Sequence, residues 1–293
     1  MIPPHMLREL RYLEISTAKA VRNVRIGPHT SRSRGSGFDF DQHLAYRPGD
    51  DVRRIDWNAT ARLNTPYVRQ THAERELDVV MALDLSQSMA IGSSRYSKKE
   101  VTTFVAASIL FSAASDQINA GFLTFSDRVL RWAPPRRASA RAWRILEEIW
   151  SLEPDEGRTL LLPAVRHMLS RLRTMSVIAI VSDFLTSEEL FDSADFRMLA
   201  TQHDVITVVI EDPVDTALPP GSGFVRVRDV ETGAGSVVAL NERTRRTYAG
   251  VVAGRRRALV DACHRLGVDV AFVRTDQAAM EPLIELFARR RRA

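Results

Sequence analysis

Cysteine is nearly absent from this sequence, because Cys263 is the single one among 293 residues. No disulfide can form within the chain, so cysteine usage gives no support to an oxidising compartment. Long apolar runs are missing too, since no segment reaches the roughly 18 apolar residues of a membrane-spanning helix. The opening residues, MIPPHMLRELRYLEI, lack the apolar core of a signal peptide. We therefore expect a cytoplasmic protein without a membrane span.

Several motifs of nucleotide and hydrolase chemistry are also absent. The sequence has no GxxxxGK(S/T) loop, no GxGxxG loop and no GxSxG elbow, which argues against nucleotide sites and serine hydrolases of those kinds. The seven histidines lack the paired spacing of a zinc site. The basic run Arg289–Arg292 has no interleaved aromatic residues and is interpreted as a solvated helix end. No nucleic-acid partner is expected.

What the sequence does contain is an alternation of apolar runs and helical patterns. Strands that are apolar on both faces belong in the middle of a sheet covered by helices on both sides. Such runs lie at Val79–Leu83, Gly121–Phe125, Val177–Val181, Val205–Ile210 and Val268–Val273, and helical patterns at Met6–Val21, Ser97–Ser115, Leu160–Leu172, Ser187–Thr201 and Arg243–Leu266. The alternation predicts a doubly wound α/β fold with a mainly parallel sheet flanked by helices.

Two parts of the chain depart from this rhythm. Residues 1–77 combine a helix, a loop rich in Arg, Ser and Gly, and the turn Pro48-Gly49-Asp50. They are too polar to hold much core alone, so we predict an N-terminal segment that docks on a domain of residues 78–293, with Trp57 at least partly buried as a packing anchor. Within that domain, Phe224–Val230 and Ser236–Leu240 flank Glu231-Thr-Gly-Ala-Gly235 and predict a β-hairpin insertion.

Oxygen-bearing side chains gather at the predicted carboxyl ends of the strands, where ligands bind in such folds. Asp84, Ser86 and Ser88 follow the first core strand at alternating positions, so that their side chains can point at one spot. Thr159 precedes a helix and Asp183 ends another core strand. A carboxylate and hydroxyls are hard oxygen ligands of the kind that Mg²⁺ or Mn²⁺ takes.

This Asp-x-Ser-x-Ser pattern, with a later Thr and a later Asp, resembles the metal-ion-dependent adhesion site of von Willebrand factor A domains. The resemblance implies that Ser86, Ser88 and Thr159 bind the metal directly. It also implies that Asp84 and Asp183 orient the site and neutralise charge, directly or through water. The fold implied is von Willebrand factor A-like, a Rossmann-type α/β domain.

A longer and ordered set of motifs resembles the bacterial domain-of-unknown-function 58 family. The set covers nearly the whole chain and comprises Tyr46-Arg-Pro-Gly-Asp-Asp-Val-Arg-Arg-Ile-Asp-Trp57, Ala61-Arg62, Asp84-Leu-Ser-Gln-Ser-Met89, Ser182-Asp-Phe184 and Asp229-Val-Glu-Thr-Gly233. That family contains a von Willebrand factor A-like domain and is often encoded beside MoxR-type AAA+ ATPases. One departure stands out, because the family's glycine pair before the threonine is Gly157-Arg158 here.

Simpler interpretations compete with the metal site. Asp84, Ser86 and Ser88 could merely cap the helix that starts near Ser97, or stabilise a turn. A second alternative is a metal-dependent, phosphatase-like hydrolase with Asp84 as nucleophile. Phosphatases of that kind usually place a second carboxylate two residues on, where this chain has Ser86.

The function expected from these residues is binding rather than catalysis. Neutral hydroxyls leave much of a cation's charge uncompensated, so a carboxylate of another protein can complete the metal's coordination shell. We expect a non-enzymatic, Mg²⁺- or Mn²⁺-dependent interaction module. By resemblance, its partner would be a MoxR-type AAA+ ATPase or a client of one, in the assembly, maturation or stress handling of other proteins.

Overall fold

The computed structural model describes residues 2–21, 34–46, 55–63, 65–72, 77–186, 188–228 and 233–277. The run Arg289–Arg292, the centre of the Tyr46–Trp57 motif and the turn between the strands of the predicted hairpin lie outside these ranges. The helices are α1 (Pro4–Val21), α2 (Trp57–Leu63), α3 (Lys98–Ser115), α4 (Ala142–Ser151), α5 (Leu162–Arg171), α6 (Ala194–Gln202), α7 (Pro213–Thr216) and α8 (Glu242–Arg265), with the 3-10 helices η2 (Gln87–Ala90) and η3 (Leu190–Asp192). The strands are β1 (Arg34–Ala45), β2 (Tyr67–His72), β3 (Asp78–Asp84), β4 (Asn119–Phe125), β5 (Val129–Arg137), β6 (Ser176–Ser182), β7 (Asp204–Glu211), β8 (Gly223–Arg228), β9 (Gly235–Leu240) and β10 (Asp269–Arg274).

The chain divides into two compact units, Met1–Gly27 with Leu77–Ala293 and Pro28–Glu76. The predicted boundary near residue 77 therefore coincides with the end of the smaller unit. The predicted segment 1–77 is divided, however, because its first helix belongs to the larger unit. Apolar side chains of α1, among them Met6 and Leu10, are fully buried in the core that also holds α3. The docking of residues 28–76 remains a prediction.

The smaller unit pairs β1 with β2 in an antiparallel sheet. Asp56 caps α2 by accepting hydrogen bonds from the backbone N–H groups of Asn58 and Ala59, both at 3.0 Å. Trp57 was predicted to be at least partly buried as a packing anchor, but 70% of its surface is exposed. A two-stranded sheet with one short helix has no core deep enough to enclose an indole ring, so burial of Trp57 depends on docking of this unit and stays a prediction.

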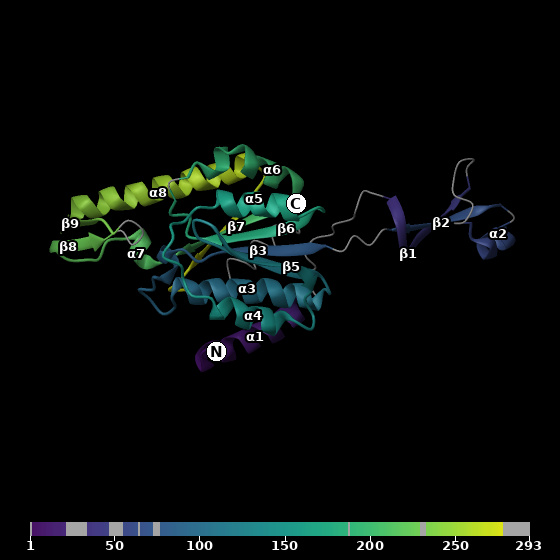
Figure 1. Cartoon of the computed structure of the whole chain (residues 1–293), viewed down its shortest axis with the longest axis horizontal. Coiled ribbons are helices and arrows are strands. Elements are labelled where there is room, and N and C mark those ends of the chain that lie inside the picture. Colours follow the sequence, from purple (N-terminus) through teal and green to yellow (C-terminus); the bar gives the residue numbers. More distant parts are fainter. Residues whose placement is uncertain are drawn as a thin grey trace. The chain divides into compact units, whose positions relative to one another are not determined.

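The larger unit has a six-stranded sheet in the order β10-β7-β6-β3-β4-β5 (Figure 1). All neighbouring pairs are parallel except β4 and β5. The chain enters at β3, builds outward through β4 to β5, and returns to β6 on the other side of β3. The mainly parallel, doubly wound α/β fold is thus confirmed. The antiparallel edge strand β5 was not predicted, because Pro134-Pro135 and three arginines break its apolar pattern.

Helices cover both faces of this sheet (Figure 1). The core on one face is formed with α1, α3 and α4, and the core on the other with α5, α6 and α8. Helix α3 is buried nearly all round, with 13 of its 18 residues buried, because α1 and α4 cover the side that the sheet leaves open. Among the described residues, none of the helices has the length and apolar composition that a bilayer-spanning helix requires.

The predicted hairpin insertion is confirmed, since β8 pairs with β9 in an antiparallel register. It lies between α7 and α8, close to the N-terminal end of α8 (Figure 1). Most of its side chains are exposed, including 80% of Phe224 and 64% of Val237.

Gly121 allows β5 to approach β4 closely. A Cβ atom at Gly121 would lie 2.6 Å from the carbonyl oxygen of Ala133 and 2.6 Å from the nitrogen of Pro135. Because both neighbours are backbone atoms of the paired strand, they cannot move away cheaply. We expect Gly121→Ala to lower the free energy of unfolding by about 1–3 kcal/mol, measured by urea denaturation.

Gly254 provides a matched control for that substitution. A Cβ atom at this position of α8 would meet nothing within 4 Å. Gly254→Ala should therefore stabilise the protein by up to about 1 kcal/mol through helix propensity. Equal effects of the two substitutions on the urea midpoint would contradict the close approach of β4 and β5.

Candidate functional site

The candidate site lies at the carboxyl end of the parallel strands, where β3 and β6 lie side by side. These two strands mark the point at which the chain changes direction across the sheet, and loops diverge there to leave a crevice. Asp84 is the last residue of β3, and Asp183 directly follows β6. Both carboxylates therefore come from strand ends that the sheet itself holds in place.

The three loops that carry the predicted residues are joined by backbone hydrogen bonds. The N–H of Asp155 donates to the carbonyl of Leu85 at 2.6 Å, and the N–H of Gln87 donates to the carbonyl of Gly157 at 3.3 Å. The hydroxyl of Thr186 donates to the carbonyl of Thr159 at 2.7 Å. The loops after β3, before α5 and after β6 thus form one connected structure.

The three predicted hydroxyl ligands meet at its centre. The Thr159 hydroxyl donates to Ser86 Oγ at 2.8 Å, and the Oγ atoms of Ser86 and Ser88 lie 3.2 Å apart. All three residues are almost fully buried. Residues far apart in sequence, 86 and 159, therefore lie in direct contact.

Asp84 is fully buried beneath these hydroxyls, and both of its oxygens accept hydrogen bonds. The backbone N–H of Ser86 donates to Oδ1 at 2.8 Å, and the Ser182 hydroxyl donates to Oδ2 at 2.5 Å. Burial and the nearby charge of Asp183 raise the pKa of Asp84 to about 7, although the hydrogen bonds from Ser182 and Ser86 act in the opposite direction. A carboxylate in this position would gain from a neighbouring cation.

Asp183 already has a cation beside it, which the sequence analysis missed. Lys98 is fully buried, and its Nζ lies 2.7 Å from Asp183 Oδ2 and 2.7 Å from Asp215 Oδ2. Burial alone would lower the pKa of Lys98, but the two carboxylates outweigh it and the pKa is raised. Position 98 is in the first turn of a helix, where a lysine is usually solvated. No sequence signal marks it as buried.

The remaining oxygen of Asp183 accepts from the backbone N–H of Leu185 at 3.0 Å. Phe184, between them, has a positive φ of 52°, a conformation uncommon for residues other than glycine. This tight turn directs the Asp183 carboxylate toward Lys98 while the Phe184 ring packs with Phe191 in the core.

The Asp84–Ser88 loop does not cap the helix that follows it. Helix α3 is capped by Ser97 itself, in a reciprocal capping box with Glu100, so the loop is not needed for that role. The bond from Ser86 N–H to Asp84 is a turn-stabilising contact of the kind considered. It accounts for one oxygen of Asp84 but not for the meeting of three hydroxyls.

Two other strand-end aspartates, Asp212 and Asp276, have structural partners. Asp212 caps α7 and also accepts hydrogen bonds from Ser93 and Thr275, which ties the loop before α3 to the end of β10. Asp276 forms two hydrogen bonds with Arg274, at 2.9 and 2.8 Å. Neither aspartate belongs to the cluster formed by the hydroxyls of Ser86, Ser88 and Thr159.

The donor set of the site fits a hard divalent cation. Among the predicted residues, the hydroxyl oxygens of Ser86, Ser88 and Thr159 are the atoms that meet at one point, so they are best placed to bind one ion directly. Within the described ranges, no group of three or more His, Cys, Asp or Glu side chains is placed to hold a metal ion. A metal here would therefore depend on hydroxyl ligands with carboxylates behind them, a set suited to Mg²⁺ or Mn²⁺.

Comparisons with known proteins give a family and a set of relatives. A family model described as "Protein of unknown function DUF58" matches residues 42–258. The uncharacterized protein Rv1480 of Mycobacterium tuberculosis is 28% identical over 302 residues, which cover 99% of this chain and 94% of that protein. The similarity therefore extends over nearly the full length of both chains.

Two solved structures are similar at low sequence identity. The conserved hypothetical protein BatB from Bacteroides thetaiotaomicron is 17% identical with a TM-score of 0.48, and the match covers 74% of this chain and 100% of that chain. An aerotolerance-related membrane protein from Bacteroides fragilis is 17% identical with a TM-score of 0.46, and the match covers 72% and 98%.

Proposed function

The chain belongs to the DUF58 family, and on that basis we propose that it is a metal-dependent protein-interaction module with a von Willebrand factor A-like site. The metal is Mg²⁺ or Mn²⁺, bound directly by Ser86, Ser88 and Thr159. Asp84 and Asp183 orient these ligands and offset the charge of the ion. The partner is a protein that supplies a carboxylate to the open coordination position, and the module itself is not an enzyme.

The observation that carries this proposal is the contact among the three hydroxyls above a buried carboxylate. Thr159 Oγ1 and Ser86 Oγ are 2.8 Å apart although the residues are 73 positions apart in sequence. Converging buried hydroxyls are poorly explained by surface polarity, since each must be desolvated. They are well explained by a shared cation, and neutral ligands would leave that cation attractive to a partner's carboxylate.

The resemblance of the motif set suggests which partner to look for. We propose a MoxR-type AAA+ ATPase or one of its clients, with the module acting in the cytoplasm on the assembly, maturation or stress handling of other proteins. A bound metal would supply a strong electrostatic contact at the centre of the interface. The residues of this chain would fix the position of the metal and the shape of the surface around it.

The test is affinity capture from native lysate with wild type and Asp84→Ala, each with Mg²⁺ and with chelator. We expect the wild type to retain partners in Mg²⁺ only, and Asp84→Ala to lose them, because residues behind a metal's direct ligands commonly change its affinity by about 10–100-fold. Ser93→Ala, at another loop of the same sheet edge, serves as the control. If all proteins keep the same partners under all conditions, the metal does not hold the interface.

A hydrolase remains the alternative proposal, and Lys98 is the residue that bears on it. A lysine near Asp84 is what a phosphoryl-transfer site would need, but the Lys98 ammonium is fully buried between Asp183 and Asp215. The place of the general acid is taken by Ser86, whose hydroxyl is bonded to Thr159. Turnover of a generic phosphate ester in Mg²⁺ that is lost in Asp84→Asn would favour the hydrolase.

A further inference from the structure

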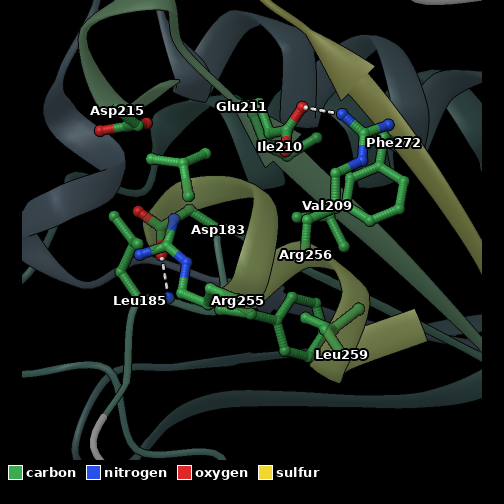
Figure 2. A pocket seen from close by; sticks show the side chains of 12 residues that line it. Asp183, Leu185, Val209, Ile210, Glu211, Asp215, Arg255, Arg256, Leu259 and Phe272 are labelled. Carbon is green, nitrogen blue, oxygen red and sulfur yellow. Dashed lines mark hydrogen bonds and ion pairs between the residues drawn. The ribbon is translucent and has the colours of Figure 1, made fainter. Parts of the chain in front are cut away.

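Thr159 is the one predicted hydroxyl ligand that does not follow a strand of the sheet. The two serine ligands follow β3, and Asp183 follows β6, where the N–H of Leu185 holds its carboxylate (Figure 2). Thr159 instead lies in the segment 152–161, which joins α4 to α5 and has neither helix nor strand. Its position beside Ser86 therefore depends on the contacts that this segment makes.

Asp155 anchors the segment to the turn between β4 and β5. Its Oδ2 accepts hydrogen bonds from the Ser126 hydroxyl at 2.7 Å and from the Gly157 N–H at 3.1 Å. Its Oδ1 accepts from the Arg128 guanidinium at 2.9 Å. The N–H of Leu160 donates to the Ser126 carbonyl at 3.0 Å, so the segment is bonded to this turn on both sides of the threonine.

The turn that receives these bonds is itself well held. Strands β4 and β5 pair in the sheet, and the Ser126 N–H donates to the Arg128 carbonyl at 3.0 Å. Arg128 contacts two carboxylates, with Nη1 2.8 Å from Asp127 and Nη2 2.9 Å from Asp155. The hydrogen bond from Ser126 does most to hold the pKa of Asp155 below its usual range. Asp155 is therefore ionised at neutral pH, and a carboxylate is a stronger acceptor than a neutral group.

Gly157 shows how closely the parts of this anchor meet. A Cβ atom at this position would lie 2.7 Å from Asp155 Oδ2, 2.7 Å from Ser126 Oγ and 2.9 Å from Asp127 Oδ1. A glycine leaves room for these oxygens, and any larger residue would push them apart. The Gly157 carbonyl also accepts from the N–H of Gln87 at 3.3 Å, which ties the anchor to the loop of the two serine ligands.

We propose that Asp155 is a positioning residue of the metal site, which holds Thr159 in place as the third hydroxyl ligand by fixing its loop to Ser126 and Arg128. The inference rests on the proposed function, because it gives Asp155 a role toward the metal which that function requires. Mg²⁺ takes its ligands at about 2.0–2.1 Å in nearly ideal octahedral geometry, so a threonine on a loosely held loop would bind it weakly.

The test is calorimetric titration of wild type, Asp155→Ala and Asp195→Ala with Mg²⁺ and with Mn²⁺. We expect Asp155→Ala to weaken metal binding about 10–100-fold, which is usual for residues behind the direct ligands of a metal. Asp195 is a matched control, since its carboxylate also pairs with an exposed arginine, Arg166 at 2.7 Å, but joins α6 to α5 rather than the metal loops. Asp195→Ala should change the affinity less than about 2-fold.

A further variant separates position from charge, because removing a negative charge near a cation also weakens its binding. Asp155→Asn loses the charge but keeps an oxygen that can accept from Ser126 and Gly157. A positioning role predicts that Asp155→Asn recovers most of the affinity that Asp155→Ala loses. Amide hydrogen exchange of residues 156–160, measured with chelator, should be faster in Asp155→Ala than in the wild type and unchanged in Asp195→Ala.

The outcomes distinguish this inference from the proposed function. If the wild type binds no metal, both are overturned, whereas metal binding that Asp155→Ala leaves unchanged overturns the positioning role alone. Equally weak binding by Asp155→Asn and Asp155→Ala, or unchanged amide exchange in Asp155→Ala, also overturns that role. If Asp155→Ala does not fold, the titration and the exchange are measured on Ser126→Ala, which removes the 2.7 Å hydrogen bond and keeps the charge.

Discussion

Replacing Ser86 and Ser88 together by alanine is expected to abolish measurable Mg²⁺ and Mn²⁺ binding. Both hydroxyls are assigned as direct ligands, and Thr159 alone cannot hold a hydrated divalent ion. Changes to residues behind the direct ligands cost about 10–100-fold in metal affinity, so the loss of two direct ligands should exceed about 100-fold. Isothermal titration calorimetry of wild type and Ser86→Ala/Ser88→Ala measures the difference.

The matched control is Ser93→Ala/Ser94→Ala, at the same sheet edge. These hydroxyls bond to Asp212 and Thr275 rather than to the candidate site. The control should therefore bind metal as the wild type does. Equal affinity of the wild type and Ser86→Ala/Ser88→Ala would show that the hydroxyls are not ligands, and their contact would then be a structural one.

We expect Lys98→Met to lower the free energy of unfolding more than any other substitution named above. The change leaves two carboxylates facing each other in the interior, with side-chain exposures of 1% for Asp183 and 11% for Asp215. Removing one partner of a buried ion pair typically destabilises a protein by about 3–5 kcal/mol. Urea unfolding in the presence of chelator, where no metal can substitute for the ammonium, measures the loss.

Lys99→Met is the control for this substitution, one position further along α3. Its ammonium pairs with Glu153, which is 81% exposed, at 3.3 Å and lies 5.0 Å from the centre of the Trp150 ring. Methionine keeps most of the packing of the Lys99 side chain, and a pair with one exposed partner contributes no more than about 1 kcal/mol. Adding Asp183→Asn to Lys98→Met should recover part of the loss, because one uncompensated charge is removed. If Lys98→Met lowers the free energy of unfolding by no more than Lys99→Met does, the two aspartates do not depend on Lys98.

The fold was predictable because buried parallel strands have a simple pattern. The five apolar runs correspond to β3, β4, β6, β7 and β10. Helices cover both faces of such strands, so successive side chains are buried whichever way they point and the sequence is apolar throughout. Helix α4 was missed although Trp143, Leu146 and Ile149 recur at helical spacing.

The candidate site was only partly predictable. Asp84, Ser86 and Ser88 are close in sequence, and the strand-end rule placed Asp183 and Thr159 at the same edge. Lys98 and Asp215 could not be found in this way, because their association depends on how α3 and α7 pack against the sheet. A lysine in a first helical turn has the same sequence context whether it faces water or a carboxylate.

Strand β5 decides how this sheet can meet other chains. It is an edge strand, and edge strands invite a further strand from another molecule to pair with their free backbone groups. Pro134 and Pro135 lie side by side within it, where the register with β4 is interrupted, and Arg136 and Arg137 follow. Proline has no N–H to donate, and like charges repel a second copy of the same strand. The Pro134–Arg137 half of the β5 edge therefore resists strand addition, which protects this part of the sheet against edge-to-edge aggregation.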